Sequence, residues 1–197
     1  MAEQYFTANP ESAHEMRSFQ VDMDGKCLTF ETDAGVFSKQ HIDPGSELLC
    51  RAMEDISGDV LDMGCGWGAM SILTMARFPE VHMTMAEINE RALELARANV
   101  RANGMKATAI SSDGFANVEG QFDVIMTNPP IRAGKSVIYG MFADAREHLK
   151  PGGALWLVIR KQQGAESAAK YLRELYAKVE LVKKKSGYHV YCCSVDP

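Results

Sequence analysis

The sequence predicts an α/β protein built on a doubly wound, mostly parallel sheet of seven strands, with an antiparallel last strand and a short N-terminal β-hairpin extension. Three observations predict it. From residue 59 onward, short apolar runs alternate with segments of helical periodicity. The runs are continuously apolar, as expected when helices cover both faces of a sheet. The chain ends in two strand-like runs around Ser186-Gly187, which indicates a terminal hairpin.

The first third of the chain is irregular and strand-like. Asp24-Gly25 separates the runs SFQVDM and KCLTFET, which is a strong hairpin signal. Pro44-Gly-Ser46 then opens a short helix, ELLCRAME. We therefore expect residues 1–45 to form an N-terminal hairpin and cover segment, and residues 46–197 to form the main domain.

Alternation of strands and helices organises the remainder. The predicted strands are 59–63, 81–87, 107–112, 122–127 and 154–160, and the predicted helices are roughly 67–77, 89–103, 136–149 and 165–177. Asn89 is suited to cap the second of these helices and Gly104 to end it. Pro151-Gly-Gly153 is expected to break the third. VELVKK and YHVYCCS form the terminal hairpin.

Composition limits the class and setting of the protein. With 197 residues, 46% of them hydrophobic and 24% charged, the chain suits one domain with a sizeable core. No apolar run approaches the ~20 residues of a membrane span, and the N-terminus lacks a signal-peptide pattern. The five cysteines form no CxxC pair, and with the five histidines they show no metal spacing. We expect a cytoplasmic protein without a metal.

The net charge of −5 hides an asymmetry. The first 50 residues hold 3 Lys/Arg and 9 Asp/Glu, whereas residues 151–197 hold 8 and 4. A protein that grips nucleic acid over a large surface is usually basic overall. Any contact with nucleic acid is therefore predicted to be local.

A glycine-rich loop, DMGCGWG (62–68), follows the first strand of the main domain. Glycines let a backbone approach a ligand closely, and the helix N-terminus that follows favours an anionic group. Gly64, Gly66 and Ala69 also satisfy the dinucleotide pattern G-x-G-x-x-G/A, with Glu87 at the spacing for a ribose hydroxyl. At this point the loop is also consistent with a dehydrogenase, or with a tight turn that binds no ligand.

Polar groups gather at the same predicted edge of the sheet. Asp62 stands two residues before the first glycine, where we expect its carboxylate to face a cationic or amino-bearing ligand. DGF (113–115) follows the third strand, and TNPPI (127–131) ends the fourth. Open α/β sheets bind ligands at the carboxyl ends of their strands, so these features predict one shared site.

These motifs together resemble the class I S-adenosylmethionine (SAM)-dependent methyltransferases, which have a Rossmann-like fold. DMGCGWG, AEIN, SDGF and NPPI occur in the order and spacing of that class. TDAGVFSKQHIDPGSELL and TNPPIRAGK more narrowly resemble the small methyltransferase (MTS) family, which includes the catalytic half of the bacterial small-subunit rRNA guanine-N2 methyltransferase. The resemblance covers about residues 30–195 and implies that residues 46–197 form a SAM-dependent methyltransferase domain.

The resemblance implies S-adenosyl-L-methionine as the cofactor. The glycine loop would line its methionine part, with Asp62 near the amino group. Glu87 would bind both ribose hydroxyls, and Asp113 would accept from the adenine amine with Phe115 nearby. The implied cofactor-binding residues are Phe37, Ser38, Asp43, Gly45, Asp62, Gly64, Cys65, Gly66, Gly68, Glu87, Asp113, Gly114, Phe115 and Asn128.

The catalytic motif implied is Asn128, Pro129, Pro130 and Ile131. An exocyclic amine on guanine is a poor nucleophile because its lone pair is delocalised into the ring. The side-chain oxygen of Asn128 and the carbonyl of Pro129 would accept its two hydrogens and favour a pyramidal nitrogen aimed at the methyl donor. The two prolines stiffen this backbone, so little reorganisation is needed.

Two features depart from the relatives. Ile131 stands where relatives that act on bases often carry an aromatic residue for stacking, and we expect Phe6, Phe37, Tyr139 or an aliphatic surface to take that role. The rRNA enzyme also carries an additional methyltransferase-like domain in front, where this chain has about fifty acidic-biased residues. RNA binding by that additional domain is therefore not inferred for this chain.

Basic residues at the ends of strands predict a local RNA contact. They are Arg132, Lys135, Arg160, Lys161, Lys183, Lys184 and Lys185. In the predicted sheet all of them lie at the carboxyl edge, which is also the cofactor edge. A solvated hairpin face is the alternative for the last three.

The leading prediction is a SAM-dependent N-methyltransferase that acts on rRNA or the small ribosomal subunit, with guanine N2 as the expected target. A protein glutamine N-methyltransferase is one alternative, because an amide nitrogen is equally planar. A nonenzymatic SAM-binding module or rRNA-assembly factor is another, and a dinucleotide oxidoreductase is a more distant one. A monomer or weak dimer without a membrane partner is expected.

Overall fold

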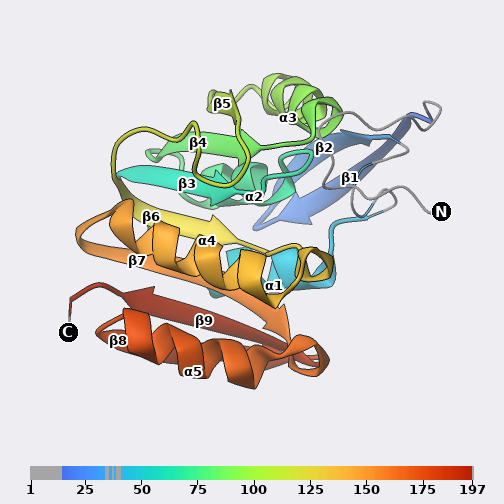
Figure 1. The fold of residues 1–197 in the computed structure, drawn as a ribbon. Coiled ribbons are helices and arrows are strands. Elements are labelled where there is room, and N and C mark those ends of the chain that lie inside the picture. Colours follow the sequence, from blue (N-terminus) through green and yellow to red (C-terminus); the bar gives the residue numbers. More distant parts are fainter. Residues whose placement is uncertain (1–14, 34–35, 37, 39–40, 197) are drawn as a thin grey trace.

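The computed structural model describes residues 15–33, 36, 38 and 41–196. A two-stranded antiparallel sheet pairs β1 (Arg17–Met23) with β2 (Lys26–Thr32). The turn between them is the predicted Asp24-Gly25, and both residues have positive φ, 52° and 82°. This backbone suits the twist of a tight hairpin. The N-terminal hairpin expected from the sequence is therefore present (Figure 1).

The main sheet has seven strands in the order β5-β4-β3-β6-β7-β9-β8. The strands are β3 (Asp59–Met63), β4 (His82–Glu87), β5 (Thr108–Ser111), β6 (Phe122–Thr127), β7 (Leu149–Arg160), β8 (Lys178–Lys185) and β9 (Tyr188–Ser194). Neighbours from β5 to β7 are parallel, whereas β9 lies between β7 and β8 and is antiparallel to both. The predicted mostly parallel sheet with an antiparallel last strand is confirmed.

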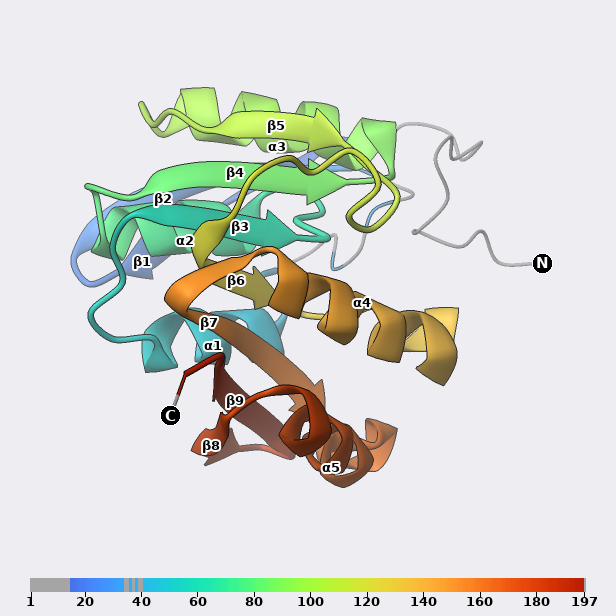
Figure 2. The same ribbon diagram turned by 60° about the vertical axis from the view of Figure 1, so that its left-hand side comes forward.

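Helices cover both faces of this sheet (Figures 1 and 2). One face carries α1 (Pro44–Ala52), α2 (Ala69–Arg77) and α3 (Glu90–Ala102), and the other carries α4 (Lys135–Glu147) and α5 (Ala165–Leu175). Short 3-10 helices, η1 (Ile131–Ala133) and η2 (Lys161–Gln163), follow β6 and β7. Each face has its own hydrophobic cluster, as a doubly wound sheet requires.

The segment Pro151-Gly-Gly153 differs from its prediction. It lies inside β7, which begins at Leu149 and not at residue 154. Gly152 has φ 78°, and a Cβ on Gly153 would lie 2.9–3.1 Å from three backbone carbonyl oxygens. The register of β6 with β7 shifts at this point, between Phe122 and Val124. The glycines therefore allow a bulge within the strand, where the sequence indicated a break before it.

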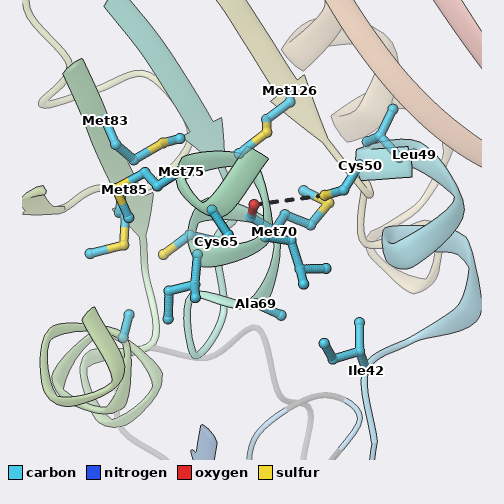
Figure 3. Packing of buried hydrophobic residues seen from close by; sticks show 14 of the residues in the cluster. Ile42, Leu49, Cys50, Cys65, Ala69, Met70, Met75, Met83, Met85 and Met126 are labelled. Carbon is cyan, nitrogen blue, oxygen red and sulfur yellow. Dashed lines mark hydrogen bonds between the residues drawn. The ribbon is translucent and has the colours of Figure 1, made fainter. Parts of the chain in front are cut away.

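The core between the sheet and α2 is rich in sulfur (Figure 3). Four methionines of this cluster, Met70, Met75, Met83 and Met85, are at most 6% exposed. Met63 is equally buried but belongs to the cluster on the other face. The thiol of Cys50 lies 3.7 Å from the carbonyl oxygen of Met70, as the dashed line in Figure 3 marks. Flexible methionines can fill irregular space between the sheet and the helix.

Two asparagines, one on α3 and one at its C-cap, fasten the hairpin to the main domain. The Asn99 carboxamide accepts from the Glu31 N–H at 2.7 Å and donates to the Glu31 carbonyl at 2.9 Å. Asn103, one helical turn later, makes the same two bonds with Thr29, at 3.0 and 2.7 Å. The two side chains thus pair with the edge of β2 that faces away from β1, as a neighbouring strand would. Asn99 also donates to the carbonyl of Trp67 at 2.9 Å, so it connects the hairpin to the glycine loop.

Among the residues that the structure describes, no helix is long and apolar enough to cross a membrane. Within the same residues, no group of His, Cys, Asp and Glu side chains is arranged to hold a metal ion.

Candidate active site

A cavity of about 940 Å³ opens at the carboxyl ends of β3, β4 and β6. β3 and β6 are adjacent, and the chain leaves them in opposite directions across the sheet. This is the topological switch point at which open α/β sheets bind ligands. The glycine loop, the end of β4, the 112–116 loop and one side of α4 form its walls.

The glycine loop is held open against the end of β4. Gly64 and Gly66 line the cavity with φ of 72° and 55°. A Cβ on either would meet no atom within 4 Å, so it would project into open space. The N–H groups of Gly64 and Cys65 both donate to the Ala86 carbonyl, at 2.9 and 3.1 Å. The loop is thereby fixed while its backbone stays accessible to a ligand.

Glu87 ends β4 with a buried carboxylate on the cavity wall, 9% exposed. One oxygen accepts from the Gly66 N–H at 2.8 Å and the other from the Asn89 N–H at 2.9 Å. Burial raises the pKa of Glu87, and these backbone bonds oppose that rise. Each carboxylate oxygen has a second lone pair, so the pair can still accept from two neighbouring hydroxyl groups.

The far end of the cavity is aromatic. The rings of Phe115 and His148 lie 4.6 Å apart with an interplanar angle of 31°. The ring Nδ1 of His148 lies 2.9 Å from the Asp144 carbonyl, which fixes that ring. The Ser112 hydroxyl donates to the Gly114 carbonyl at 2.7 Å and so shapes the loop that carries Phe115. This end offers flat apolar surface beside the acidic Asp113, which also lines the cavity.

The α4 wall was missed by the sequence analysis. Ser136, Gly140, Asp144 and His148 recur every four residues and all line the cavity. Spacing of four places side chains on one helical face, and this is the signal that could have found them. The segment was instead interpreted only as a helix that covers the sheet.

Most predicted cofactor residues come together in this cavity. Those that line it are Ser38, Asp43, Gly64, Cys65, Gly66, Glu87, Asp113, Gly114, Phe115 and Asn128, together with Pro129 and Pro130. Gly45 and Gly68 do not line it; a Cβ on Gly45 would meet the Tyr188 ring, and one on Gly68 would lie 3.1 Å from the Ala96 Cβ. Both glycines therefore permit close packing of neighbouring elements. Phe37 lies outside the described residues.

Asp62 is a correction to the sequence-based expectation. Its side chain is fully buried and does not line the cavity, so the structure gives no support to contact with the cofactor amino group. One carboxyl oxygen accepts from the Ser71 hydroxyl at 2.6 Å, and Oδ1 has no hydrogen-bond partner. Burial raises the pKa of Asp62 to about 7. Side chains alternate along β3, so Asp62 points toward α2 while Met63 lines the cavity.

A second pocket of about 490 Å³ adjoins the first. Ser38, Asp43, Asn128 and Pro129 line both of them, so the Asn-Pro pair stands at their junction. The walls of the second pocket alone include Ile131, Val158, Ile159, Arg132, Arg160 and Tyr188. It therefore combines aliphatic walls with two arginines.

The Asn128 carboxamide is held from one side. Its Nδ2 donates to Asp43 Oδ2 and to the Ser46 hydroxyl oxygen, each at 3.0 Å. The same Asp43 oxygen caps α1 by accepting from the N–H groups of Gly45 and Ser46, at 2.8 and 3.0 Å. The bonds through Nδ2 leave the side-chain oxygen of Asn128 as the acceptor of this group.

The predicted basic residues lie at the same edge of the sheet. Arg132 and Arg160 line the second pocket. Tyr188 of β9 pairs with Arg160 of β7 on one side and with Lys185 of β8 on the other. The Lys183–Lys185 run therefore ends beside Arg160. Lys161 follows in η2 and Lys135 begins α4, although neither lines the cavity or the second pocket described above.

Tyr139 does not face either pocket. Its ring stacks on Tyr171 at 4.3 Å with an interplanar angle of 10°, and Lys135 Nζ lies 4.9 Å from the ring centroid. The expectation that it offers a stacking face to the substrate is not supported by this placement. Phe6 and Phe37 lie outside the described residues.

The strand order, the glycine loop, the acidic end of β4 and the Asn-Pro-Pro segment after β6 define a class I SAM-dependent methyltransferase. The chain belongs to the methyltransferase small domain family, whose model matches residues 27–192. The predicted class and its cofactor are thereby confirmed.

Two relatives in sequence differ in how much of them the chain covers. It is 41% identical over 195 residues to the uncharacterized protein YbxB of Bacillus subtilis, and this alignment covers 96% of this chain and 97% of that protein. It is 38% identical over 129 residues to ribosomal RNA small subunit methyltransferase C of Pasteurella multocida, and this alignment covers 63% of this chain and 39% of that protein.

Two solved structures are similar. The 16S rRNA N2 G1207 methyltransferase (RsmC) of T. thermophilus, in complex with AdoMet and guanosine, has a TM-score of 0.82 and 27% identity, covering 94% of this chain and 52% of that one. A methyltransferase from Pyrococcus furiosus has a TM-score of 0.69 and 26% identity, covering 83% and 91%. The chain thus spans about half or less of these rRNA methyltransferases, but nearly all of YbxB.

Proposed function

We propose that this protein is a SAM-dependent N-methyltransferase that acts on an exocyclic amine of rRNA, with guanine N2 of small-subunit rRNA as the target. The observation that carries the proposal is the position of Asn128 and Pro129, which line both the cofactor-sized cavity and the smaller pocket beside it. A group that touches both is placed to hold an acceptor amine against a methyl donor.

When bound, SAM supplies an electrophilic methyl group on a positively charged sulfur. The protein then has to orient the amine. The Asn128 side-chain oxygen and the Pro129 carbonyl accept its two hydrogens, which turns the nitrogen lone pair out of the base plane. Glu87 holds the ribose, and the stiff proline pair keeps the acceptors fixed. Positioning and fixed dipoles would thus lower the barrier without a general base before transfer. The N–C bond forms as the S–C bond to the methyl group breaks, the neutral thioether leaves, and the methylated nitrogen releases its extra proton to water.

The second pocket is the proposed site of the acceptor base. Ile131, Val158 and Ile159 give it aliphatic walls, which would replace the aromatic stacking residue of relatives. Arg132 and Arg160 lie on its wall and suit phosphate oxygens of an RNA backbone. The basic end of β8 extends this surface. The guanosine in the similar T. thermophilus structure agrees with this class of substrate.

The direct test is transfer of labelled methyl groups from SAM. Three acceptors taken from cells that lack the gene are compared: protein-free rRNA, assembled small ribosomal subunits and RNase-treated protein extract. Label in an RNA-containing sample is expected, and digestion to nucleosides identifies the base. Label only in protein would reject the rRNA proposal and favour methylation of glutamine. No label with SAM still bound would favour a nonenzymatic SAM-binding module.

Asn128→Ala runs beside the wild type as the matched variant. We expect the dissociation constant for SAM to stay within about twofold and turnover to fall about 10²-fold or more, as for loss of a placed transition-state contact. A large loss of SAM affinity instead would make Asn128 a structural residue of the cavity. Calorimetric titration with SAM separates the two outcomes.

A further inference from the structure

The carboxamide of Asn128 has two possible orientations, and only one is useful. Rotation by 180° about its last bond exchanges the oxygen and the nitrogen. If the nitrogen faced the acceptor amine, it would present hydrogens to hydrogens, and the Pro129 carbonyl would be the one acceptor left for the two hydrogens. The chemistry proposed above, on which this inference rests, therefore needs something that decides between the two orientations.

The negative charge of the Asp43 carboxylate selects the orientation of the Asn128 carboxamide. A carboxylate oxygen carries no hydrogen, so it can only accept. It lies 3.0 Å from Nδ2 of Asn128, and the Ser46 hydroxyl oxygen lies at the same distance. In the rotated orientation the amide oxygen would face the carboxylate, which replaces a charge-assisted hydrogen bond with repulsion. The favoured orientation directs Oδ1 away from Asp43.

Asp43 is itself held rigidly. Its Oδ2 accepts from the N–H groups of Gly45 and Ser46 as the N-cap of α1. The Tyr188 hydroxyl lies 3.4 Å from its other oxygen, and the Arg160 guanidinium donates to that hydroxyl and lies 4.6 Å from the ring centroid. The carboxylate is therefore bound from the helix on one side and from β9 on the other.

Gly45 makes this arrangement possible. A Cβ at this position would lie 2.6 Å from Cε1 of Tyr188, so only glycine admits the ring. Asp43 and Gly45 were assigned by resemblance to the wall of the cofactor pocket. Asp43 does line that cavity, and it also contacts Asn128 at the junction with the second pocket, whereas Gly45 packs against Tyr188.

We propose that Asp43 is the positioning residue of methyl transfer: its carboxylate fixes the orientation of the Asn128 carboxamide so that Oδ1 faces the acceptor amine. Arg160 and Tyr188 complete the support from the substrate side. Asp43 acts through Asn128 and does not itself touch the reacting atoms.

The kinetic test uses Asp43→Ser. Serine is an equally good N-cap, so α1 is kept, but its hydroxyl is too short to reach Asn128. We expect turnover at saturating SAM to fall roughly 10- to 100-fold, with SAM affinity within about twofold. In an Asn128→Ala background the same change should alter turnover by less than about twofold, because both act as one unit. Additive losses, or a loss of SAM affinity alone, would overturn the proposal.

A second readout does not depend on activity. The side-chain amide signals of Asn128 are identified in NMR spectra by their absence from Asn128→Ala. In the wild type these protons should exchange slowly, and in Asp43→Ser they should exchange rapidly, with Asp43→Asn closer to the wild type. Unchanged exchange in Asp43→Ser would refute the positioning role even if the acceptor were not RNA. Absence of methyl transfer by the wild type to any acceptor would instead refute the proposed function.

Discussion

Replacing Asn99 with alanine tests how the hairpin and the glycine loop are held together. Asn99 is completely buried and makes three hydrogen bonds, to the N–H and carbonyl of Glu31 and to the carbonyl of Trp67. Each buried group that loses its partner costs about 1–3 kcal/mol. Glu31 is exposed, so water can replace part of its two bonds. Alanine regains about 0.5 kcal/mol of helix propensity.

The expected net loss is roughly 2–3 kcal/mol of unfolding free energy, which corresponds to a Tm lower by about 5–10 °C for a chain of this size. Asn103→Ala is the matched control, because Asn103 also makes three bonds, with Thr29 and with the Asn99 carbonyl. It is only partly buried, so water can replace them, and about 1 kcal/mol is expected.

The assay is urea unfolding of both variants, followed by titration with SAM. Because Asn99 also holds the Trp67 carbonyl, its variant should bind SAM more weakly, whereas Asn103→Ala should not. Equal losses of stability in the two variants would refute the reasoning that burial decides the cost. Unchanged SAM affinity in Asn99→Ala would show that the hairpin and the loop are not coupled.

Two further predictions concern charge. Burial raises the pKa of Asp62 to about 7, above its ordinary value of 3.8. The folded protein therefore holds this proton more tightly than the unfolded chain does. The resulting contribution to the free energy of unfolding is fully present below about pH 4 and is lost as the pH rises to about 7. Asp62→Asn stays neutral, and its stability relative to the wild type should rise by roughly 2–4 kcal/mol between pH 4 and pH 8 in urea titrations; a constant difference would contradict the raised pKa. Reversal of charge at Lys183–Lys185 should weaken RNA binding and flatten its dependence on salt, with SAM binding unchanged. Lys178→Glu, at the opposite end of β8, is the control, and equal effects of the two changes would remove the patch from the model.

The parts of the fold that sequence predicted are those with a local signal. Asp24-Gly25 indicated the hairpin, and the apolar runs from residue 59 indicated the parallel strands. The beginning of β7 was missed because Pro151-Gly-Gly153 is a strong break signal, yet Leu149 already pairs with Phe122 at the start of β6 and the three residues form a bulge within the strand. Tertiary pairing there overrides local preference.

The residues of the site also divide into those with a local signal in the sequence and those without one. Glu87 and Asn128 were predicted to share a site because Glu87 ends one apolar strand and Asn128 directly follows another, and the carboxyl ends of parallel strands meet at one edge. Asp62 was misplaced because its distance along the chain from the loop does not tell which face of β3 its side chain occupies. His148 was missed because it lies at the end of a helix that had no other functional signal.

Sequence alone therefore determined the class of the fold, the edge that carries the chemistry and the Asn-Pro-Pro motif. The tertiary structure decided which groups support that motif. Asp43 precedes α1 and Tyr188 begins β9, 145 residues later, and the two meet beside Asn128 only when both elements pack at the end of β6. Local patterns cannot encode such a contact, because it depends on the packing of three separate elements and on the space that Gly45 leaves for the ring.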